Sequence, residues 1–396
     1  MKRRNIFRVY NAGLGLVFVV FLAFGMSSII VMIRSDGFVS IEEIVSKQQT
    51  STAIFNSPLS SLYKYKITLH KERAAKIVAI GSSRSFQFRE KAFSESFTNL
   101  GGVIGDIEYS ELFIRKLIEA HKPEIIIWAV DYHDFFEARR PGRPWRTEDD
   151  HNIFSPLGFT VEGIIDWKTY WKVMFSGKFF EDFPVELRGL SAKVTGDGFG
   201  HDGSFYDFGG YYDSLGKGDI VYTNSRESLY QNILDTSSQG DRSNTPQPWA
   251  LESFKSIVDY AKSEGVIILP VLVPSGPAIM EIMDERPETF RLGLDKLREQ
   301  LPHYSPYFAD FVDPREYGSG ECEFIDAYHG GEVTYLRIVL GLFDMPGSPL
   351  QPYVRRDLIR RLIKDYENEI LITEGRIGSQ FKNVRRIKFS PMCEGI

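Results

Sequence analysis

The N-terminus carries the feature that most restricts how this chain can fold. From Val9 to Ile33 there is no charged residue, and Leu, Val, Phe and Ile dominate. A helix needs about 20 such residues to cross the hydrocarbon layer of a membrane, so the segment is long enough to span one. A buried helix of a globular domain is the alternative, but the length of the run and its charged flanks argue against it.

The flanks of this segment indicate its orientation. Three Arg and one Lys precede it, and only Arg34 directly follows it, a bias that places the N-terminus in the cytoplasm. The small residues Gly25, Ser27 and Ser28 lie inside the apolar run and do not form the exit of a cleavable signal peptide. We therefore expect residues 1–35 to be a cytoplasmic stub and a single-pass signal anchor in a bacterial cytoplasmic (inner) membrane, with the remainder in the periplasm or outside.

Length and composition limit which kinds of domain and function the remaining chain can have. The 396 residues are 43% hydrophobic, enough for one large domain or one domain with a big insertion. The net charge of -6 and a single internal basic stretch at 139–146 argue against nucleic-acid binding. Cys322 and Cys393 are too few for a zinc site or a disulfide framework. They either form one bridge, which would pin the C-terminal tail, or remain free.

After a polar connecting segment at 36–75, strand and helix patterns alternate. Strands are expected at 77–80, 97–100, 125–130 and 266–273, and helices at 106–121 and 251–263. Such alternation is typical of a parallel sheet with helices on both faces. We expect an α/β sandwich over residues 76–396.

The alternation of strand and helix patterns is interrupted at about 137–249, and we interpret this segment as a large insertion. It carries Trp145, Trp167 and Trp171 and a run at 198–213 rich in Gly, Asp and Tyr. Because it follows the carboxyl end of a parallel strand, where ligands bind in open sheets, it is placed to be a lid or a sugar-binding platform. An ordinary packed insertion is an equally open interpretation.

Candidate catalytic residues occur at two places. Ser83 follows the first strand in a Gly-Ser-Ser turn, which suits a nucleophile. Asp326 and His329 are three positions apart, so the carboxylate can fix the ring for a base. The other histidines in polar segments are expected at the surface: His70, His121, His151, His201 and His303.

These blocks resemble those of the SGNH, or GDSL-like, hydrolases. Gly81-Ser82-Ser83 matches the first block and Asp326-x-x-His329 the last. The resemblance implies a three-layer sandwich around a central parallel sheet, with Ser83 as nucleophile, His329 as base and Asp326 orienting it. Residues 99–106 resemble the second block, in which a Gly N–H helps form the oxyanion hole. Gly105 is the best match there, followed by Gly101 and Gly102.

One block departs from the family pattern. Asp131 stands where the third block has an Asn that stabilises the oxyanion. An ionised carboxylate there would repel the developing negative charge, so another donor serves or Asp131 has a different role, such as binding substrate. Arg84 is expected to hold an anionic or polar substrate group, with a structural salt bridge as the alternative.

The Gly-Ser-Ser-Arg variant with an N-terminal anchor is similar to one branch of the superfamily. That branch works beside membrane-bound O-acyltransferases and includes proteins of alginate and other exopolysaccharide acetylation and the D-alanyl-lipoteichoic acid transfer protein. The resemblance implies transfer of an acyl group, expected to be acetyl, to or from a cell-envelope polysaccharide through a seryl ester. It implies no cofactor and no metal.

Three other functions stay open at this level. Asp131, His133 and Asp134 form a carboxylate and imidazole cluster with ligand types suited to a divalent metal. A non-catalytic scaffold of the same fold would bind polysaccharide through the aromatic insertion. A free-standing periplasmic carbohydrate esterase would need no membrane partner.

Overall fold

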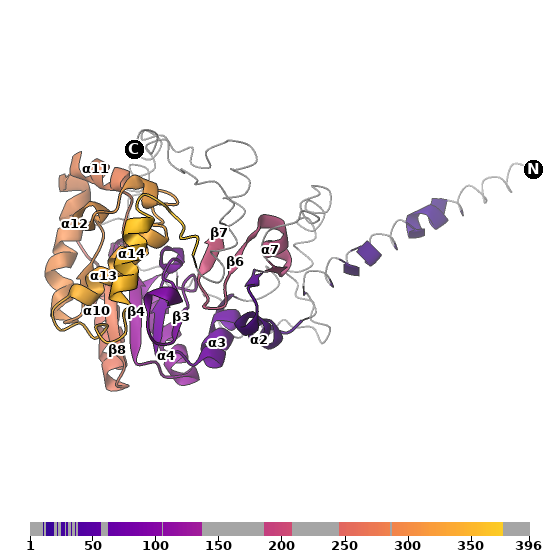
Figure 1. Ribbon diagram of the computed structural model, residues 1–396, viewed down its shortest axis with the longest axis horizontal. Coiled ribbons are helices and arrows are strands. Elements are labelled where there is room, and N and C mark those ends of the chain that lie inside the picture. Colours follow the sequence, from indigo (N-terminus) through magenta and orange to yellow (C-terminus); the bar gives the residue numbers. More distant parts are fainter. Residues whose placement is uncertain are drawn as a thin grey trace, which may run out of the picture.

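The computed structural model describes residues 39–56, 62–104, 106–136, 186–207, 245–285 and 287–374, with scattered positions between 11 and 36 (Figure 1). Among these residues, none of the helices combines the length and the apolar character needed to span a bilayer. Part of the expected anchor, Val9 to Ile33, lies outside the described residues. The transmembrane segment stays a prediction.

A five-stranded parallel sheet forms the centre of the domain. Its order is β3 (Phe97–Asn99), β2 (Ile77–Ile80), β4 (Ile125–Val130), β8 (Ile267–Leu272) and β9 (Ala309–Asp310). Every neighbouring pair is parallel. The α/β class and the four expected strands are confirmed, and β9 is an addition that is too short to show a hydrophobic pattern.

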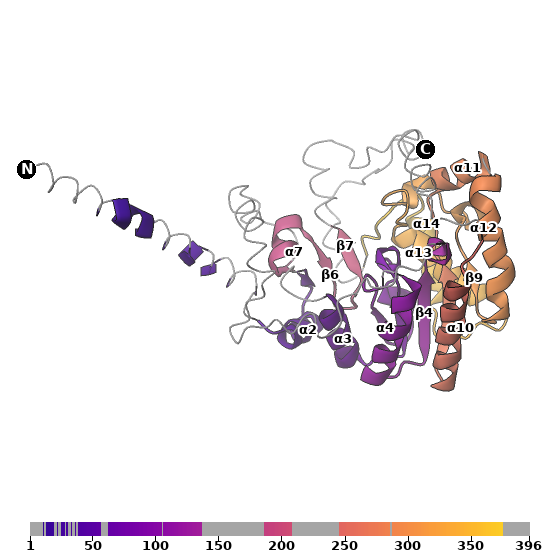
Figure 2. The same ribbon diagram turned by 180° about the vertical axis from the view of Figure 1, so that it is seen from behind.

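Alternate residues of the central strands pack on opposite faces of the sheet. Val78 and Ile80 belong to a core shared with α4 (Ile107–Ala120), α10 (Pro248–Ser263), α11 (Pro277–Glu285) and α12 (Pro287–Gln300). Ile77 and Ala79 belong to a second core with α13 (Glu332–Asp344) and α14 (Arg356–Asp365). The helices α13 and α14 face the viewer in Figure 1, and the helices α4 and α10 face the viewer in Figure 2. Helices therefore cover both faces, as expected for a buried parallel sheet.

Local sequence signals explain where the two expected helices begin and end. The Asp106 side chain caps α4 by accepting a hydrogen bond from the N–H of Tyr109, and the helix ends at Ala120, before Pro123. Pro248 occupies the first turn of α10. Gly265, with φ of +71°, reverses the chain after α10 and leads it into β8.

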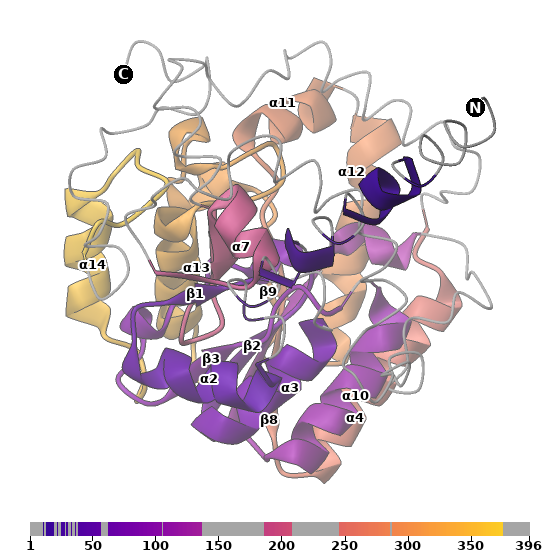
Figure 3. The same cartoon turned by 90° about the vertical axis from the view of Figure 1, so that its right-hand side faces the viewer.

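A second, smaller sheet, the accessory sheet, lies at the β3 side of the molecule (Figure 3). Its order is β5 (Leu187–Arg188), β1 (Ile54–Phe55), β6 (Asp197–Phe199) and β7 (Phe205–Asp207). With α2 (Ile41–Thr50) and α3 (Leu62–Arg73) it encloses its own apolar cluster, which includes Val45, Tyr65 and Phe199. The helix α7 (Leu190–Thr195) connects β5 to β6. The expected connecting segment thus supplies a strand and buried core residues.

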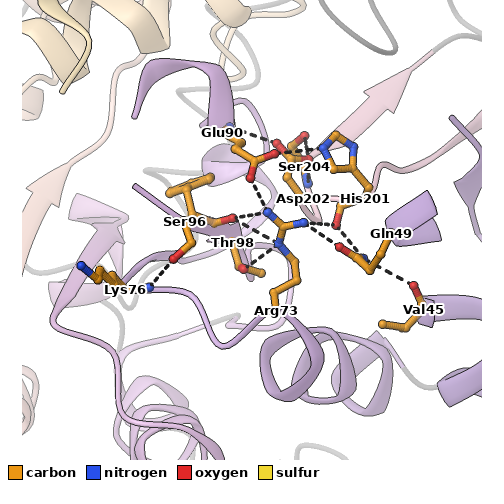
Figure 4. A network of polar contacts seen from close by, with 11 residues as sticks. Val45, Gln49, Arg73, Lys76, Glu90, Ser96, Thr98, His201, Asp202 and Ser204 are labelled. Carbon is orange, nitrogen blue, oxygen red and sulfur yellow. Dashed lines mark hydrogen bonds and ion pairs between the residues drawn. The ribbon is translucent and has the colours of Figure 1, made fainter. Parts of the chain in front are cut away.

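A polar network fastens the accessory sheet to the edge of the central sheet (Figure 4). Arg73 donates to Glu90 Oε1 at 2.5 Å, to Gln49 Oε1 at 2.7 Å and to the Phe97 carbonyl at 3.0 Å. His201 Nε2 lies 2.9 Å from the other carboxylate oxygen of Glu90. These contacts join helices, the β3 edge and the insertion in one network.

The histidines expected at the surface differ in their surroundings. His70 is fully buried, because its ring packs against α4 with Nε2 2.7 Å from the His121 carbonyl. His201 is only partly exposed and pairs with Glu90. The surface prediction is wrong for His70, and it holds for His303. His121 is partly exposed, and His151 lies outside the described residues.

Candidate active site

The turn after β2, the nucleophile turn, carries Ser83 at the carboxyl edge of the sheet. Gly81 has φ of +151°, and a Cβ there would lie 2.7 Å from the Ala129 carbonyl oxygen, so a larger residue would not fit between β2 and β4. A short 3₁₀ helix follows at Ser83–Ser85, capped by the Ser82 side chain, which accepts from the Arg84 N–H. Ser83 itself is exposed.

The loop at 326–329, the histidine loop, is closed by its own backbone. The Ile325 N–H donates to the His329 carbonyl at 2.7 Å. Asp326 Oδ1 accepts from the N–H groups of Tyr328 and His329, both at 2.8 Å. The Gly276 N–H, after β8, donates to the Ala327 carbonyl at 2.7 Å and holds the loop against the sheet.

The two segments bring Ser83, His329 and Asp326 into one hydrogen-bonded chain. Ser83 Oγ lies 2.9 Å from His329 Nε2. His329 Nδ1 lies 2.6 Å from Asp326 Oδ2. If Nδ1–H donates to the carboxylate, Nε2 is left free to accept the Ser83 proton, which is the arrangement required of a nucleophile, base and orienting acid.

The charge state of Asp326 suits that arrangement. Burial alone would raise the pKa of this carboxyl group, but the hydrogen bond from His329 and the two backbone N–H donors oppose burial. The net pKa lies below its ordinary value, so Asp326 is ionised at neutral pH. An ionised Asp326 can stabilise the imidazolium that forms when His329 accepts a proton.

Arg84 and Asp131 form a buried ion pair beside the triad. Arg84 Nη1 lies 2.7 Å from Asp131 Oδ1, with the two side chains 6% and 9% exposed. Arg84 Nη2 also donates to the Val273 carbonyl at 3.0 Å, just after β8. Burial would raise the pKa of Asp131, but the Arg84 charge lowers it below its usual value. The structural salt bridge considered as the alternative for Arg84 is what the structure contains, and the substrate-binding role expected for Arg84 and Asp131 stays a prediction.

Two of the three expected oxyanion donors are occupied elsewhere. The Gly101 N–H donates to Asn99 Oδ1 at 2.8 Å, and the Gly102 N–H donates to the Gly81 carbonyl at 2.9 Å. The prediction is wrong for these two, because each N–H already donates to another group of the protein. Gly105 lies outside the described residues.

The backbone N–H of Ser83 is a donor that the sequence reasoning missed. It has no hydrogen-bond partner in the described part of the chain, and it lies at the first position of the short helix. A donor in this place can meet the oxygen of an acyl group attached to Ser83. The residue type gives no signal for it, since every residue except Pro carries the same N–H.

No family model, curated protein or solved structure matches this chain. The geometry of Ser83, His329 and Asp326 is therefore the basis for assigning a function.

The remaining sequence expectations concern a metal, the insertion and the cysteines. In the described ranges no group of three His, Cys, Asp or Glu residues is placed to hold a metal ion, so Asp131, His133 and Asp134 do not form the cluster considered as an alternative.

The part of the 198–213 run that the structure describes is packed, with Asp202, Ser204 and Tyr206 buried. This favours the packed insertion over an open platform for residues up to 207. The three insertion tryptophans and Cys393 lie outside the described residues, and Cys322 is disulfide-bonded.

Proposed function

We propose that this protein is a serine-dependent acyl-transfer enzyme of SGNH type, with that family's three-layer fold, acting on a cell-envelope polysaccharide or exopolysaccharide. The hydrogen-bonded chain from Ser83 through His329 to Asp326 carries the proposal. An exposed serine that contacts an imidazole, itself oriented by an ionised carboxylate, has the parts that nucleophilic acyl transfer requires.

The proposed reaction has two halves. Ser83 Oγ attacks the carbonyl carbon of an acyl ester while His329 Nε2 takes the hydroxyl proton, and the Ser83 N–H donates to the developing oxyanion. The C–O bond to the leaving alcohol then breaks, and His329 returns the proton to that alcohol, which leaves an acyl-Ser83 ester. In the second half a sugar hydroxyl or water gives its proton to His329 and attacks the acyl-Ser83 ester, which regenerates Ser83.

The exposure of the site supports a large acyl acceptor. Ser83 is exposed, and the side chains of His329 and Asp326 are 32% and 31% exposed. A catalytic serine at the open edge of the sheet is accessible to a sugar unit within a polymer or to an acyl group carried by another protein. A small molecule that had to be enclosed would favour a deeper site.

The N-terminal segment supports action at a membrane. A retained anchor would confine Ser83 to the outer surface of the cytoplasmic membrane. Acyl donors made in the cytoplasm must cross that membrane, and one helix cannot form a path, so we propose a membrane-bound O-acyltransferase as partner. Gly13, Gly15 and Gly25 in the segment would allow close approach to neighbouring helices.

The catalytic proposal is tested on the full-length protein with a fluorophosphonate probe and a generic acetyl ester. Wild-type protein should be labelled, and Ser83→Ala should not. Ser83→Ala and His329→Ala should each lower ester turnover by about a thousandfold or more, and the double variant should lose little more, because triad members act as a unit. Near-normal turnover by Ser83→Ala would refute the serine mechanism. An unlabelled, inactive wild-type protein would favour the non-catalytic scaffold.

The membrane proposal needs separate experiments. A reporter that is active only outside the cytoplasm, fused after Ile396, should be active. A form with residues 1–35 replaced by a cleavable signal should hydrolyse the simple ester but fail to acylate the polymer in cells. Normal polymer acylation by the soluble form would favour a free-standing periplasmic esterase.

A further inference from the structure

Asn99 lies beside the nucleophile turn although it is distant from Ser83 in the sequence. It is the last residue of β3, which pairs in parallel with β2 so that Asn99 is opposite Ala79. The chain leaves β2 two residues after Ala79 to form the turn. Asn99 is fully buried, so its polar atoms have no access to water.

The Asn99 side chain connects the nucleophile turn to the neighbouring loop. Its Nδ2 donates to the Ser85 carbonyl at 2.8 Å and to the Phe88 carbonyl at 3.0 Å. Its Oδ1 accepts from the Gly101 N–H at 2.8 Å. Both N–H donors and the acceptor are used, which fixes the orientation of the amide group.

The backbone N–H and carbonyl groups of Asn99 are also both hydrogen-bonded. Its N–H donates to the Asp202 carbonyl at 2.7 Å, and its carbonyl accepts from Lys66 Nζ at 3.0 Å. Lys66 is fully buried and also donates to the Gly203 carbonyl at 2.6 Å. Asn99 is thus anchored to α3 and to the insertion on one side, and it holds the turn on the other.

We propose that Asn99 is a positioning residue for Ser83, an inference that rests on the proposed serine mechanism. Ser85 is two residues after Ser83 in the same short helix, so a carbonyl held at Ser85 limits how far the Ser83 hydroxyl can move from His329. Without the amide donor, two buried carbonyls lose a partner and the turn is free to shift. Displacement of a nucleophile by about 1 Å is enough to slow a reaction severely.

The test compares Asn99→Asp with wild type in the full-length protein, using the concentration dependence of fluorophosphonate labelling. At pH 8 the isosteric carboxylate faces two carbonyl oxygens, and we expect the maximum labelling rate to fall at least tenfold. The probe concentration that gives half this rate should stay the same, because Asn99 does not contact the probe. As the pH falls towards 5.5, the carboxyl group takes up a proton and recovers one donor. The ratio of variant to wild-type rate should therefore rise.

Two further variants separate positioning from a general loss of stability. Asn99→Ser, which is too short to reach both carbonyls, should be at least fivefold slower without the added pH dependence. Thr98→Val is the matched control: it removes a partly buried hydrogen bond that Thr98, in the same strand, accepts from Arg73 Nε, and it leaves the hydrogen bonds of Asn99 to the turn in place. Its rate should stay within twofold of wild type.

The outcomes distinguish this inference from the function on which it rests. Folded Asn99→Asp protein that is labelled at the wild-type rate at pH 8 would overturn the positioning role alone, as would Thr98→Val protein that is equally slow. Absence of labelling in wild type would overturn the serine mechanism, and the positioning role with it.

Discussion

The Arg84 guanidinium lies against the Asp131 carboxylate, with Nη1 and Oδ1 2.7 Å apart. Asp131 occupies the position where the SGNH pattern that the sequence resembles has an oxyanion-stabilising Asn, and an isolated carboxylate there would oppose the proposed catalysis. The paired guanidinium compensates that charge. The ion pair also links the nucleophile turn to the end of β4 and, through the Val273 carbonyl, to the end of β8.

Breaking this pair should destabilise the fold strongly. Arg84→Met leaves a buried carboxylate without its cation, a change that typically costs about 3–5 kcal/mol. The double variant Arg84→Met, Asp131→Leu should lose less than Arg84→Met alone. Urea unfolding measures the free energy of unfolding of both variants. Arg361→Met is the control, since Arg361 pairs with Glu374 in an exposed position and its loss should leave the unfolding midpoint nearly unchanged. Equal stability of Arg84→Met and wild type would contradict the structural role.

Asp326→Asn should abolish most activity without unfolding the protein. The amide can donate to His329 Nδ1, which places the ring proton on Nε2 and removes the acceptor for Ser83. We expect ester turnover to fall by roughly 10³- to 10⁴-fold, as loss of the correct tautomer does in serine enzymes. Asp344→Asn, at a surface acid paired with Arg356, is the control. A fall of less than tenfold would show that another group orients the imidazole.

His70 should make the stability of the fold depend on pH. Burial lowers the pKa of His70 to about 4, below its ordinary value of 6.5. The unfolded chain therefore takes up a proton as the pH falls through 6.5, whereas the folded chain does so only near pH 4. Stability is unaffected by His70 above pH 6.5 and decreases as the pH falls from 6.5 to 4, by at most on the order of 3 kcal/mol.

His70→Gln tests this prediction, because Gln keeps a donor for the His121 carbonyl and does not titrate. The free energies of unfolding of the two proteins are compared at pH 7.5 and pH 5. Wild type should lose more stability than His70→Gln between these values. The same loss in both proteins would assign the pH dependence to other groups.

The two cysteines should be joined. Cys322 lies four residues before Asp326 and is disulfide-bonded, and the only other cysteine in the sequence is Cys393. A bridge between them would tie the C-terminal tail to the histidine loop in an oxidising compartment. Thiol labelling of unfolded, unreduced protein should find no free thiol, and labelling after reduction should find two. Two free thiols before reduction would exclude the bridge.

The central sheet could be predicted because its strands are long apolar runs between clear breaks. β4 contains Ile125, Ile126 and Ile127, and it begins after a Pro and ends before a polar turn. The residues of the candidate triad could be selected because few residue types support that chemistry, although only the fold shows that they meet. The accessory sheet could not be predicted, since strands of two or three residues show no periodicity.

The roles of Arg84, Gly101 and Gly102 could not be predicted from the sequence, because they depend on which residues the fold places beside them. Arg84 follows a candidate nucleophile, which suggests contact with substrate, but parallel pairing of β2 with β4 brings Asp131 within reach of it. Gly101 and Gly102 lie in a segment that resembles the second SGNH block, yet their N–H groups donate to Asn99 Oδ1 and to the Gly81 carbonyl. The partner of a backbone N–H depends on the local path of the chain, which the residue type does not specify.

The contact between Ser83 and His329 joins positions 246 residues apart. Contacts of such long range are slow to form, because closing a long loop costs entropy. Because the N-terminal part of a chain is made first, Ser83 is present well before His329 is synthesised. Until then Ser83 has no base and is an ordinary alcohol. Under the proposed serine mechanism, a chain whose synthesis stops before His329 would carry Ser83 without its base and would not turn over esters.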